Sequence, residues 1–206
     1  TAPWAVMILA HNEERHIAAC LDSIFAGDPD RRFEIYVMAN GCTDRTVAVA
    51  QEVCTRMAQT HPWAANFTAR VIDIPEAGRN NAWNRFVHEF SAREARCIGM
   101  MDADIIFLEP ETVFSLVSTI AGNPHVRAAS GRQRKDLLFK PRKSLWDRLS
   151  IATSTMTATI EGQITGQLYC LRADMARNLY LPRDLSANDD GFFKQALCTD
   201  FLTRPI

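Results

Sequence analysis

The sequence predicts an α/β fold in which a mainly parallel central sheet carries helices on both faces. Short apolar segments that fit buried strands alternate with longer segments whose apolar residues recur at helical spacing. Parallel strands need crossover connections, and crossover helices cover both faces of the sheet. The 206 residues, of which 47% are hydrophobic, suffice for one large domain or at most two small ones.

Strands and helices are expected to alternate as far as Ser130. The strands are Trp4–Ala10, Phe33–Ala39, Ala69–Ile74, Cys97–Ile105 and Val126–Ser130. The helices between them show apolar faces within Ile17–Phe25, Val47–Met57, Ala82–Phe90 and Glu111–Ala121. Asn12, Thr43 and Asn80 are expected to cap the first three helices. Gly27 is expected to end the first helix.

The rest of the chain is less regular. The segment "SGRQRKDLLFKPRKSLWDRLS" predicts a basic loop followed by a helix. The segment "ITGQLYCLRAD" predicts a strand with a glycine before it, and "SANDDGFFKQALCTDF" predicts a loop that opens a helix.

Charge and cysteine content exclude some classes of protein. The net charge is −1 and the pI is near 6.5, so no global charge attracts nucleic acid or a membrane. No apolar run reaches the roughly 18 residues that a membrane helix needs. The six cysteines form no CxxC pair or zinc-like spacing, so we interpret them as reduced core residues in a cytoplasmic protein. The start at Thr1, without a signal-like segment, is compatible with a fragment.

Polar clusters follow the predicted strands at their carboxyl ends. They are His11–Asn12, Asn40–Asp44, Gly78–Asn80 and Asp102–Asp104. Open α/β sheets bind ligands beyond the carboxyl ends of their strands. The sequence therefore predicts one ligand site on this rim.

Asp102 and Asp104 are the most informative of these residues. Buried carboxylates are costly unless they are paired or bind a metal, and residues two apart on a strand point the same way. Hard divalent cations such as Mg²⁺ bind a few carboxylates together with substrate phosphate oxygens. The alternatives are a solvated strand end or an aspartate that caps the next turn.

The ordered motifs resemble glycosyltransferase family 2, which has the Rossmann-like GT-A fold. They are "VMILAHNEERHIAACLDSIFAG", "FEIYVMANGCTDRTVAVAQEV", "GRNNAWN", "MDADIIFLEP", "GQLYCLRAD" and "NDDGFF", and they cover nearly all of the chain. The resemblance implies a single domain over residues 1–206, with a nucleotide-sugar half at 1–108 and an acceptor-side half, open to C-terminal truncation, at 109–206. It also implies an enzyme that transfers a sugar from a nucleotide-sugar donor with inversion at the anomeric carbon.

The family's Asp-x-Asp motif is matched by Asp102 and Asp104. The resemblance implies that Asp104 binds Mn²⁺ or Mg²⁺ bridging the donor diphosphate. Asp102 then lies near the ribose, the donor sugar and the metal. Arg79, after the glycine of "GRNNAWN", is expected to approach the diphosphate, unless it is a solvated helix-start arginine.

The nucleobase is expected to lie against His11, Asn12 and Glu13, although these residues could also form only a helix cap. Asn40 stands where the family usually has an aspartate that reads the base. An amide both donates and accepts, so Asn40 could meet uracil through its oxygen or suit another base. A UDP-sugar is the favoured donor.

The "NDDGFF" segment matches the family's catalytic-base segment. Asp189 is expected to be the base, with Asp190 as the alternative in register, and Asn188 replaces a glutamate. Helix capping alone would also explain an aspartate here. Gly166 and Gln167 match the acceptor-side segment.

The acceptor is an unidentified hydroxyl compound: a sugar, a lipid-linked molecule or a small molecule. The one local charge cluster consists of Arg127, Arg132, Arg134, Lys135, Lys140, Arg142 and Lys143. It is either a solvated face or a surface for an anionic acceptor, an acidic carrier or lipid headgroups at the inner membrane face.

Two rival functions stay open. A nucleotidyltransferase would share the metal carboxylates, but it normally has a glycine-rich loop after the first strand, and "AHNEERH" has no glycine. A non-catalytic nucleotide-sugar or carbohydrate-binding module is compatible with the departures at Asn40 and Asn188.

Overall fold

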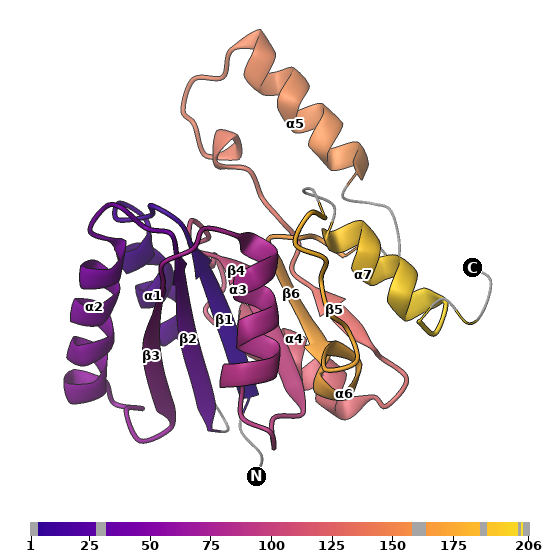
Figure 1. Ribbon diagram of the computed structural model, residues 1–206. Coiled ribbons are helices and arrows are strands. Elements are labelled where there is room, and N and C mark those ends of the chain that lie inside the picture. The colour runs from indigo at the N-terminus through magenta and orange to yellow at the C-terminus, as the bar shows by residue number, and fades with distance from the viewer. Residues whose placement is uncertain (1–3, 28–31, 158–163, 186–188, 202, 204–206) are drawn as a thin grey trace.

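The computed structural model describes the chain except residues 1–3, 28–31, 158–163, 186–188, 202 and 204–206, and it leaves the side chains at 154–157, 189 and 190 undescribed. One six-stranded sheet runs through it in the order β3-β2-β1-β4-β6-β5 (Figure 1). The strands are β1 (Trp4–Ala10), β2 (Phe33–Asn40), β3 (Phe67–Ile74), β4 (Cys97–Asp102), β5 (Ala128–Ser130) and β6 (Leu168–Arg172). The first four strands are mutually parallel, whereas β6 runs antiparallel to both β4 and β5.

Helices cover both faces of this sheet, which confirms the predicted α/β class. One face carries α1 (Ile17–Phe25), α2 (Thr46–Thr60) and α4 (Thr112–Gly122). The other face carries α3 (Arg79–Arg85), the π-helical turn η1 (Phe86–Phe90), α6 (Ala173–Ala176) and α7 (Asp189–Cys198). The 3₁₀ turn η2 (Asp136–Leu138) and helix α5 (Leu145–Thr157) stand apart from both layers (Figure 1).

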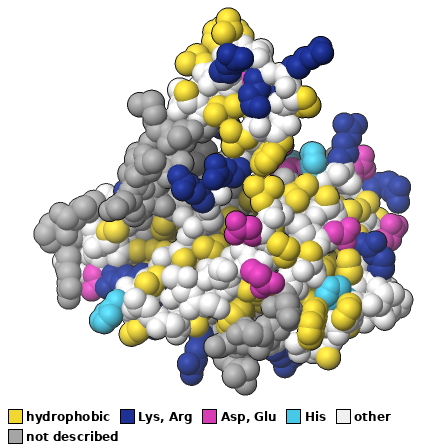
Figure 2. Space-filling model, turned by 180° about the vertical axis from the view of Figure 1, so that it is seen from behind, with side chains coloured by type: hydrophobic (Ala, Val, Ile, Leu, Met, Phe, Trp, Pro, Cys, Tyr) yellow, Lys and Arg dark blue, Asp and Glu magenta, His cyan; other side chains and the backbone are white. Residues whose placement is uncertain are grey.

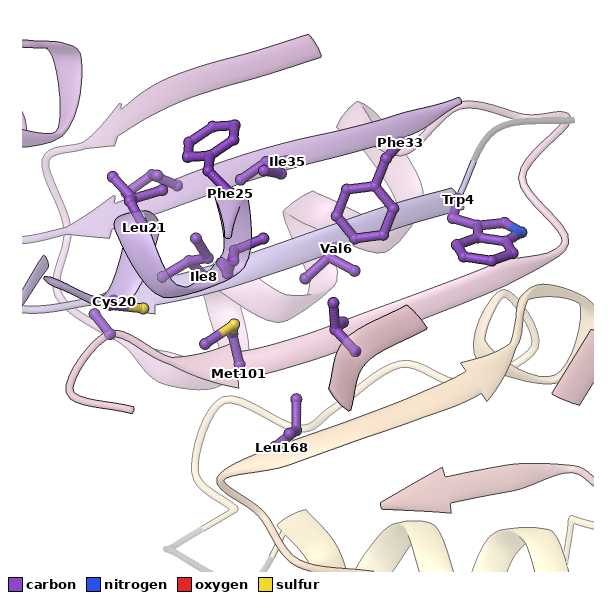
Figure 3. Packing of buried hydrophobic residues seen from close by; sticks show 14 of the residues in the cluster. Trp4, Val6, Ile8, Cys20, Leu21, Phe25, Phe33, Ile35, Met101 and Leu168 are labelled. Carbon is purple, nitrogen blue, oxygen red and sulfur yellow. The ribbon is translucent and has the colours of Figure 1, made fainter. Parts of the chain in front are cut away.

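Strand β1 shows how the sequence builds the two cores. Successive side chains of a strand point to opposite faces. Trp4, Val6 and Ile8 therefore pack with α1, α2 and α4, while Ala5 and Met7 pack with α3 and α7. Figure 3 shows the first of these cores, where aromatic rings from β1 and β2 meet. All seven β1 residues are buried, so the central strand reads as one continuous apolar run.

Several predicted boundaries change in the structure. Strand β4 ends at Asp102 instead of Ile105, and β3 begins at Phe67. The helix predicted through Phe90 changes at Phe86 into a π-helical turn, which the Ser91 backbone N–H closes on the Phe86 carbonyl at 2.8 Å. No helix in the described part of the chain is long and apolar enough to cross a membrane.

Candidate active site

A pocket opens at the carboxyl ends of β1, β2 and β4, where the sequence places its polar clusters. Its volume is about 390 Å³. Its lining residues are Leu9, His11, Glu13, Asn40, Ala77, Gly78, Arg79, Asp102, Ala103 and Asp104. Six predicted site residues thus share one cavity, whereas Asn12, Gly166 and Gln167 lie outside its lining.

His11 follows β1 at the mouth of the pocket. Its Nδ1 lies 2.6 Å from the backbone carbonyl oxygen of Asn40. A carbonyl only accepts hydrogen bonds, so Nδ1 carries the proton and donates. In the neutral ring Nε2 is then an acceptor, and no bond to a described residue uses it.

Asn40 ends β2 and is buried at the base of the pocket. Its Nδ2 donates to the Ala10 carbonyl at 2.8 Å, and its Oδ1 accepts from the Gly78 backbone N–H at 3.0 Å. These partners fix the orientation of the amide, because a carbonyl needs a donor and an N–H needs an acceptor. Asn40 therefore joins β1, β2 and the start of α3, besides facing the pocket.

Gly41 allows this junction to close. It has a φ of 60°, and a Cβ there would lie 2.8 Å from the Ala77 backbone. Only glycine meets both conditions without strain. The close approach brings the loop that precedes α3 against the end of β2.

The loops after β1 and β2 are tied together by side chains. Asn12, with a φ of 57°, accepts the Thr43 backbone N–H at 2.7 Å, and the Glu13 N–H donates to Thr46 Oγ1 at 2.7 Å. The capping predictions for Asn12 and Thr43 are therefore wrong. The N-cap position of α1 is taken by His16, and Asp44 Oδ1 accepts the Thr46 N–H at the start of α2.

Asp44, which the sequence places in the polar cluster Asn40–Asp44, has a structural role that was not predicted. Desolvation opposes its ionisation, but hydrogen bonds from Thr46 and from the Glu14 backbone leave the pKa of Asp44 below its ordinary value. The "TDRT" sequence, an acidic residue two positions before a helix-starting threonine, was the available signal. Asp44 fixes the loop that carries Asn40 and Gly41.

Asp102 and Asp104 both line the pocket, although not as neighbours on one strand. Asp102 is the last residue of β4, and Asp104 lies in the turn that follows. The Ala103 N–H donates to the Leu9 carbonyl at 3.1 Å, which holds this turn against β1. The prediction that the strand itself aligns the two carboxylates is wrong; the turn presents Asp104, which is exposed, beside the half-buried Asp102.

Arg79 is the cation of the pocket. Its Nη1 donates to Asp102 Oδ1 at 2.6 Å, and its Nη2 donates to the Gly166 carbonyl at 2.6 Å. The Asp102 backbone N–H in turn donates to the Gln167 carbonyl at 3.0 Å. The predicted acceptor-side residues Gly166 and Gln167 therefore contact the site through their backbones and hold Arg79 and Asp102.

The pocket is electrostatically negative. It holds the carboxylates of Glu13, Asp102 and Asp104 against the guanidinium of Arg79. Cys20 lies beside this pocket, next to the backbone of Asp102. Burial first, and then the charges of the same three carboxylates, raise the pKa of the Cys20 thiol to about 12.

The donor set fits a hard divalent cation that shares its ligands with a substrate. Among the described residues no three His, Cys, Asp or Glu side chains converge to form a complete metal site. Mg²⁺ and similar ions commonly bind one or two carboxylates and take the remaining oxygens from phosphates and water. Asp102 and Asp104 supply two such carboxylates at an open rim.

Asp189 is the first residue of α7, and its side chain, like that of Asp190, lies outside the described part of the structure. The chain before α7 is tied to α3 by Asn80, whose Nδ2 donates to the carbonyls of Pro182 and Leu185, each at 2.9 Å. The prediction that Asn80 caps α3 is therefore wrong, since Gly78 occupies the N-cap position. Asp189 lies four positions after Leu185, so about 14 Å of extended chain at most joins them.

A larger pocket of about 680 Å³ lies beside the first on the α3 side. Ala77, Gly78 and Arg79 line both pockets. Tyr180, which stacks on His88 with ring centroids 5.6 Å apart, and Arg183 form part of its outer wall. The rim therefore has room for a molecule that extends past Arg79.

The chain matches one protein-family model, and its fold resembles those of several solved structures. The family model described as "Glycosyl transferase family 2" matches residues 5–173. No curated protein matches the chain. Among solved structures, the mannosyltransferase PcManGT from Pyrobaculum calidifontis, in complex with GDP-Man and Mn²⁺, superposes with a TM-score of 0.71 at 21% identity, over 97% of this chain and 52% of that one.

Two further structures show the same fold. S. aureus TarS 1–349 has a TM-score of 0.62 at 17% identity, over 93% of this chain and 54% of that one. Glucosyl-3-phosphoglycerate synthase from Mycobacterium tuberculosis, in complex with Mn²⁺, UDP and phosphoglyceric acid, has a TM-score of 0.55 at 20% identity. The superposition covers 84% of this chain and 57% of that one. The chain spans about half the length of these proteins.

Proposed function

The chain belongs to glycosyl transferase family 2, and on this premise we propose that it is a metal-dependent, inverting glycosyltransferase that uses a nucleotide-diphosphate sugar. One observation carries the proposal. Glu13, Asp102 and Asp104 line the same pocket as Arg79, at the rim where α/β sheets bind nucleotides. A diphosphate would meet a net negative wall there, so its binding needs an additional cation.

The metal is assigned to Asp104 and Asp102, and Mn²⁺ or Mg²⁺ suits these oxygen ligands. A bound divalent ion neutralises charge on the donor diphosphate as it leaves. Arg79 keeps Asp102 oriented toward the pocket, and its guanidinium is the positive charge that the protein contributes to the pocket lining. Two of the similar structures are complexes with Mn²⁺, which supports a divalent cation at this position.

The nucleoside is assigned to the β1 and β2 side of the pocket. His11 offers Nε2 as an acceptor there, and Glu13 and Asn40 complete this wall. UDP stays the favoured donor nucleotide. The similar structures differ in their nucleotide, since one is a complex with GDP-Man and another is a complex with UDP.

The acceptor is proposed to approach from the α7 side. Asp189, or Asp190 if the register differs by one, would deprotonate the acceptor hydroxyl as it attacks the anomeric carbon. The tie between Asn80 and Leu185 supports this role, because it brings the chain before α7 next to Arg79. A sugar, a lipid-linked compound or a small molecule are the acceptor classes. A cytoplasmic location belongs to the same proposal and is supported by the six unbridged cysteines.

A panel of nucleotide sugars tests the proposal. Each is added with Mn²⁺, with Mg²⁺ or with EDTA, and the melting temperature and the release of nucleoside diphosphate are measured. We expect a cation-dependent rise in melting temperature for one donor, because a ligand that binds only the native state stabilises it. Binding without release in the presence of varied acceptors would instead support a non-catalytic module. Release of pyrophosphate from a nucleoside triphosphate and a sugar phosphate would support a nucleotidyltransferase.

A further inference from the structure

Helix α5 presents three large apolar side chains of its first two turns to solvent. Leu145 is 83% exposed, Trp146 79% and Leu149 55%, and Phe139, just after η2, is 61% exposed. The helix stands apart from the sheet in Figure 1. An amphipathic helix of a globular protein normally turns its apolar face to the core. The orientation of α5 is the reverse.

The polar side of α5 is held by its own connecting segment. Lys140 Nζ donates to Asp147 Oδ2 at 2.8 Å, and Lys135 Nζ donates to Ser150 Oγ at 3.0 Å. At roughly 100° per residue, the three exposed apolar side chains fall on one arc, and Asp147 and Ser150 fall beyond it. The bonds from the two lysines therefore keep the apolar arc turned outward.

The first turn of α5 has a defined start. Ser144 Oγ accepts the Asp147 N–H at 3.1 Å, and Asp147 Oδ2 accepts the Ser144 N–H at 2.8 Å. This reciprocal pair is a capping box, which satisfies two of the backbone donors at a helix start. Leu145 and Trp146 are thus exposed on an ordered turn and not on a frayed end.

Positive charge surrounds this apolar arc. Residues 132–148 contain seven Lys and Arg and two Asp, an excess of five positive charges in a chain whose net charge is −1. Arg142 and Arg148 are exposed, and neither pairs with a described residue. Figure 2 shows hydrophobic and cationic side chains together on the projecting lobe.

We propose that η2 and α5 form a docking element for an anionic lipid surface. Leu145, Trp146 and Leu149 would enter the boundary between headgroups and acyl chains, and the free arginines would contact lipid phosphates. An outward apolar arc with tryptophan and flanking cations is the pattern of a helix that lies in a membrane interface. A second copy of the chain fits less well, because it would bring two strongly positive surfaces together.

This assignment relocates the membrane contact predicted from the basic stretch 127–143. Arg127 belongs to the sheet edge, where its Nη1 donates to the Leu197 carbonyl at 2.6 Å and lies 3.4 Å from Asp200 Oδ1. The apolar contact residues lie at 139–149 instead. The positive charge in the sequence predicted the region of the contact, but it did not predict which side of α5 makes it.

The docking element leaves the sheet beside the candidate site. The carbonyl of Gly131, the residue after β5, accepts a hydrogen bond from Thr165 Oγ1 at 3.1 Å. Gly166 follows Thr165 in the chain, and its carbonyl accepts the hydrogen bond from Arg79. A lipid surface at α5 would therefore lie on the rim that carries the pocket. This favours a lipid-linked acceptor, a consequence that rests on the proposed function; the docking itself does not.

Vesicle binding by the 206-residue chain tests the docking element without donor, acceptor or metal. The vesicles contain phosphatidylcholine alone or equal parts phosphatidylcholine and phosphatidylglycerol. We expect sedimentation with the anionic vesicles and at least about tenfold weaker binding to the neutral ones. Arg142→Gln with Arg148→Gln should remove most of this preference. The control Arg93→Gln with Arg96→Gln changes two exposed arginines that precede the amino end of β4, away from the pocket rim, and should not.

The apolar contribution has its own variant and readout. Trp146→Ser with Leu149→Ser should lower anionic-vesicle binding by about tenfold or more, because it removes apolar surface from the interface. The control Trp63→Ser changes an exposed tryptophan after α2 and should bind as wild type does. In a Trp63→Phe background Trp146 is the one exposed indole, since Trp4 and Trp83 are each 2% exposed. Its emission should shift to the blue on binding and be quenched by brominated lipid.

Several outcomes would overturn the proposal. One is equal binding to neutral and anionic vesicles, and another is anionic binding without a change in Trp146 emission. A dimer seen by light scattering that Trp146→Ser with Leu149→Ser dissociates would make this face a self-association surface. Binding to polyglutamate but not to vesicles would show that this face binds an acidic protein instead of a lipid surface. Unchanged melting temperatures of the variants show that the losses are not due to unfolding.

Discussion

Arg79 and Asp102 form the central ion pair of the candidate site, with Nη1 and Oδ1 2.6 Å apart. The same guanidinium reaches the Gly166 carbonyl through Nη2. Arg79 starts α3, Asp102 ends β4, and Gly166 precedes β6, so one planar side chain joins three elements at the rim. A guanidinium can donate in two directions from a fixed fork, which an ammonium group cannot do with the same geometry.

Arg79→Lys should therefore weaken the site although it keeps the charge. We expect metal-dependent nucleotide affinity to fall by about 10- to 100-fold, as for other residues that orient a metal ligand. The free energy of unfolding should fall by only about 1 kcal/mol, because the pair is partly exposed. The control is Arg56→Lys, which changes an exposed arginine paired with Asp22 at 2.6 Å, away from the site. Equal nucleotide affinity in Arg79→Lys and wild type, measured by calorimetry, would contradict the positioning role.

Asp104→Asn should remove the cation dependence of nucleotide binding. Asp104 is exposed in a turn, so the protein should stay folded with an unchanged melting temperature. Calorimetric titration of UDP and GDP with Mn²⁺ or EDTA should show a large cation effect in wild type and little in the variant. Glu109→Gln removes an exposed carboxylate outside the pocket and serves as control. If EDTA lowers affinity as much in Asp104→Asn as in wild type, Asp104 does not bind the metal.

The fold was predictable because its signals are local. The continuous apolar run at Trp4–Ala10 and the helical spacing within Ile17–Phe25 each follow from burial of one segment. The rim was predictable from the same alternation, since it requires only that β1, β2 and β4 run parallel. Six of the predicted site residues accordingly line one pocket.

The finer geometry was not predictable, because tertiary contacts decide it. Asn12 has the composition of a helix cap, yet a hydrogen bond from the Thr43 N–H holds it in a left-handed conformation before α1 begins. Asp104 continues an apolar strand pattern, yet Ala103 bonds to β1 and turns the chain. The outward face of α5 was also invisible, because helical spacing does not say which face meets a core.

Asn40→Asp tests whether the amide is structural. A carboxylate cannot donate to the Ala10 carbonyl, so we expect a loss of about 1 to 3 kcal/mol in unfolding free energy at neutral pH. The loss should shrink as the buffer is acidified, because a protonated acid can donate that bond. Asn123→Asp is the matched control, since Asn123 Oδ1 accepts from the His125 N–H and a carboxylate can do the same. Equal denaturant midpoints for Asn40→Asp and wild type at neutral pH would show that the bond to the Ala10 carbonyl contributes little.

The capping box of α5 should depend on acid in a defined window. The hydrogen bond from Lys140, and then those from Ser144, lower the pKa of Asp147 from 3.8 to about 2. A depressed pKa means that the contribution is complete above about pH 4 and is lost as the pH falls through about 2. Asp147→Ala should remove this dependence and, because it deletes the acceptor of the Ser144 N–H, speed amide exchange in the first turn of α5 at neutral pH. Asp136→Ala, in η2, is the control; equal exchange in Asp147→Ala and wild type would contradict the cap.

The catalytic base gives the most direct test of the chemistry. Asp189 opens α7, and α7 is anchored over the sheet by Phe193, whose ring lies 5.2 Å from those of both Trp83 and Tyr169. An anchored helix start four residues beyond Leu185 can serve the acceptor side, while the nucleotide occupies the β1 and β2 side. Asp189→Asn keeps the shape of the side chain and removes its ability to take a proton.

We therefore expect Asp189→Asn to lower single-turnover transfer by about 10²- to 10⁴-fold, the usual effect of losing a general base, with donor affinity nearly unchanged. Asp190→Asn is measured in parallel and should keep most of its transfer rate. A dead Asp190→Asn beside an active Asp189→Asn would move the base by one residue. Full activity in both variants would place the base elsewhere. Loss of donor affinity together with transfer would show that this helix start binds the nucleotide sugar, because a pure general base contributes to the transition state and not to the bound donor.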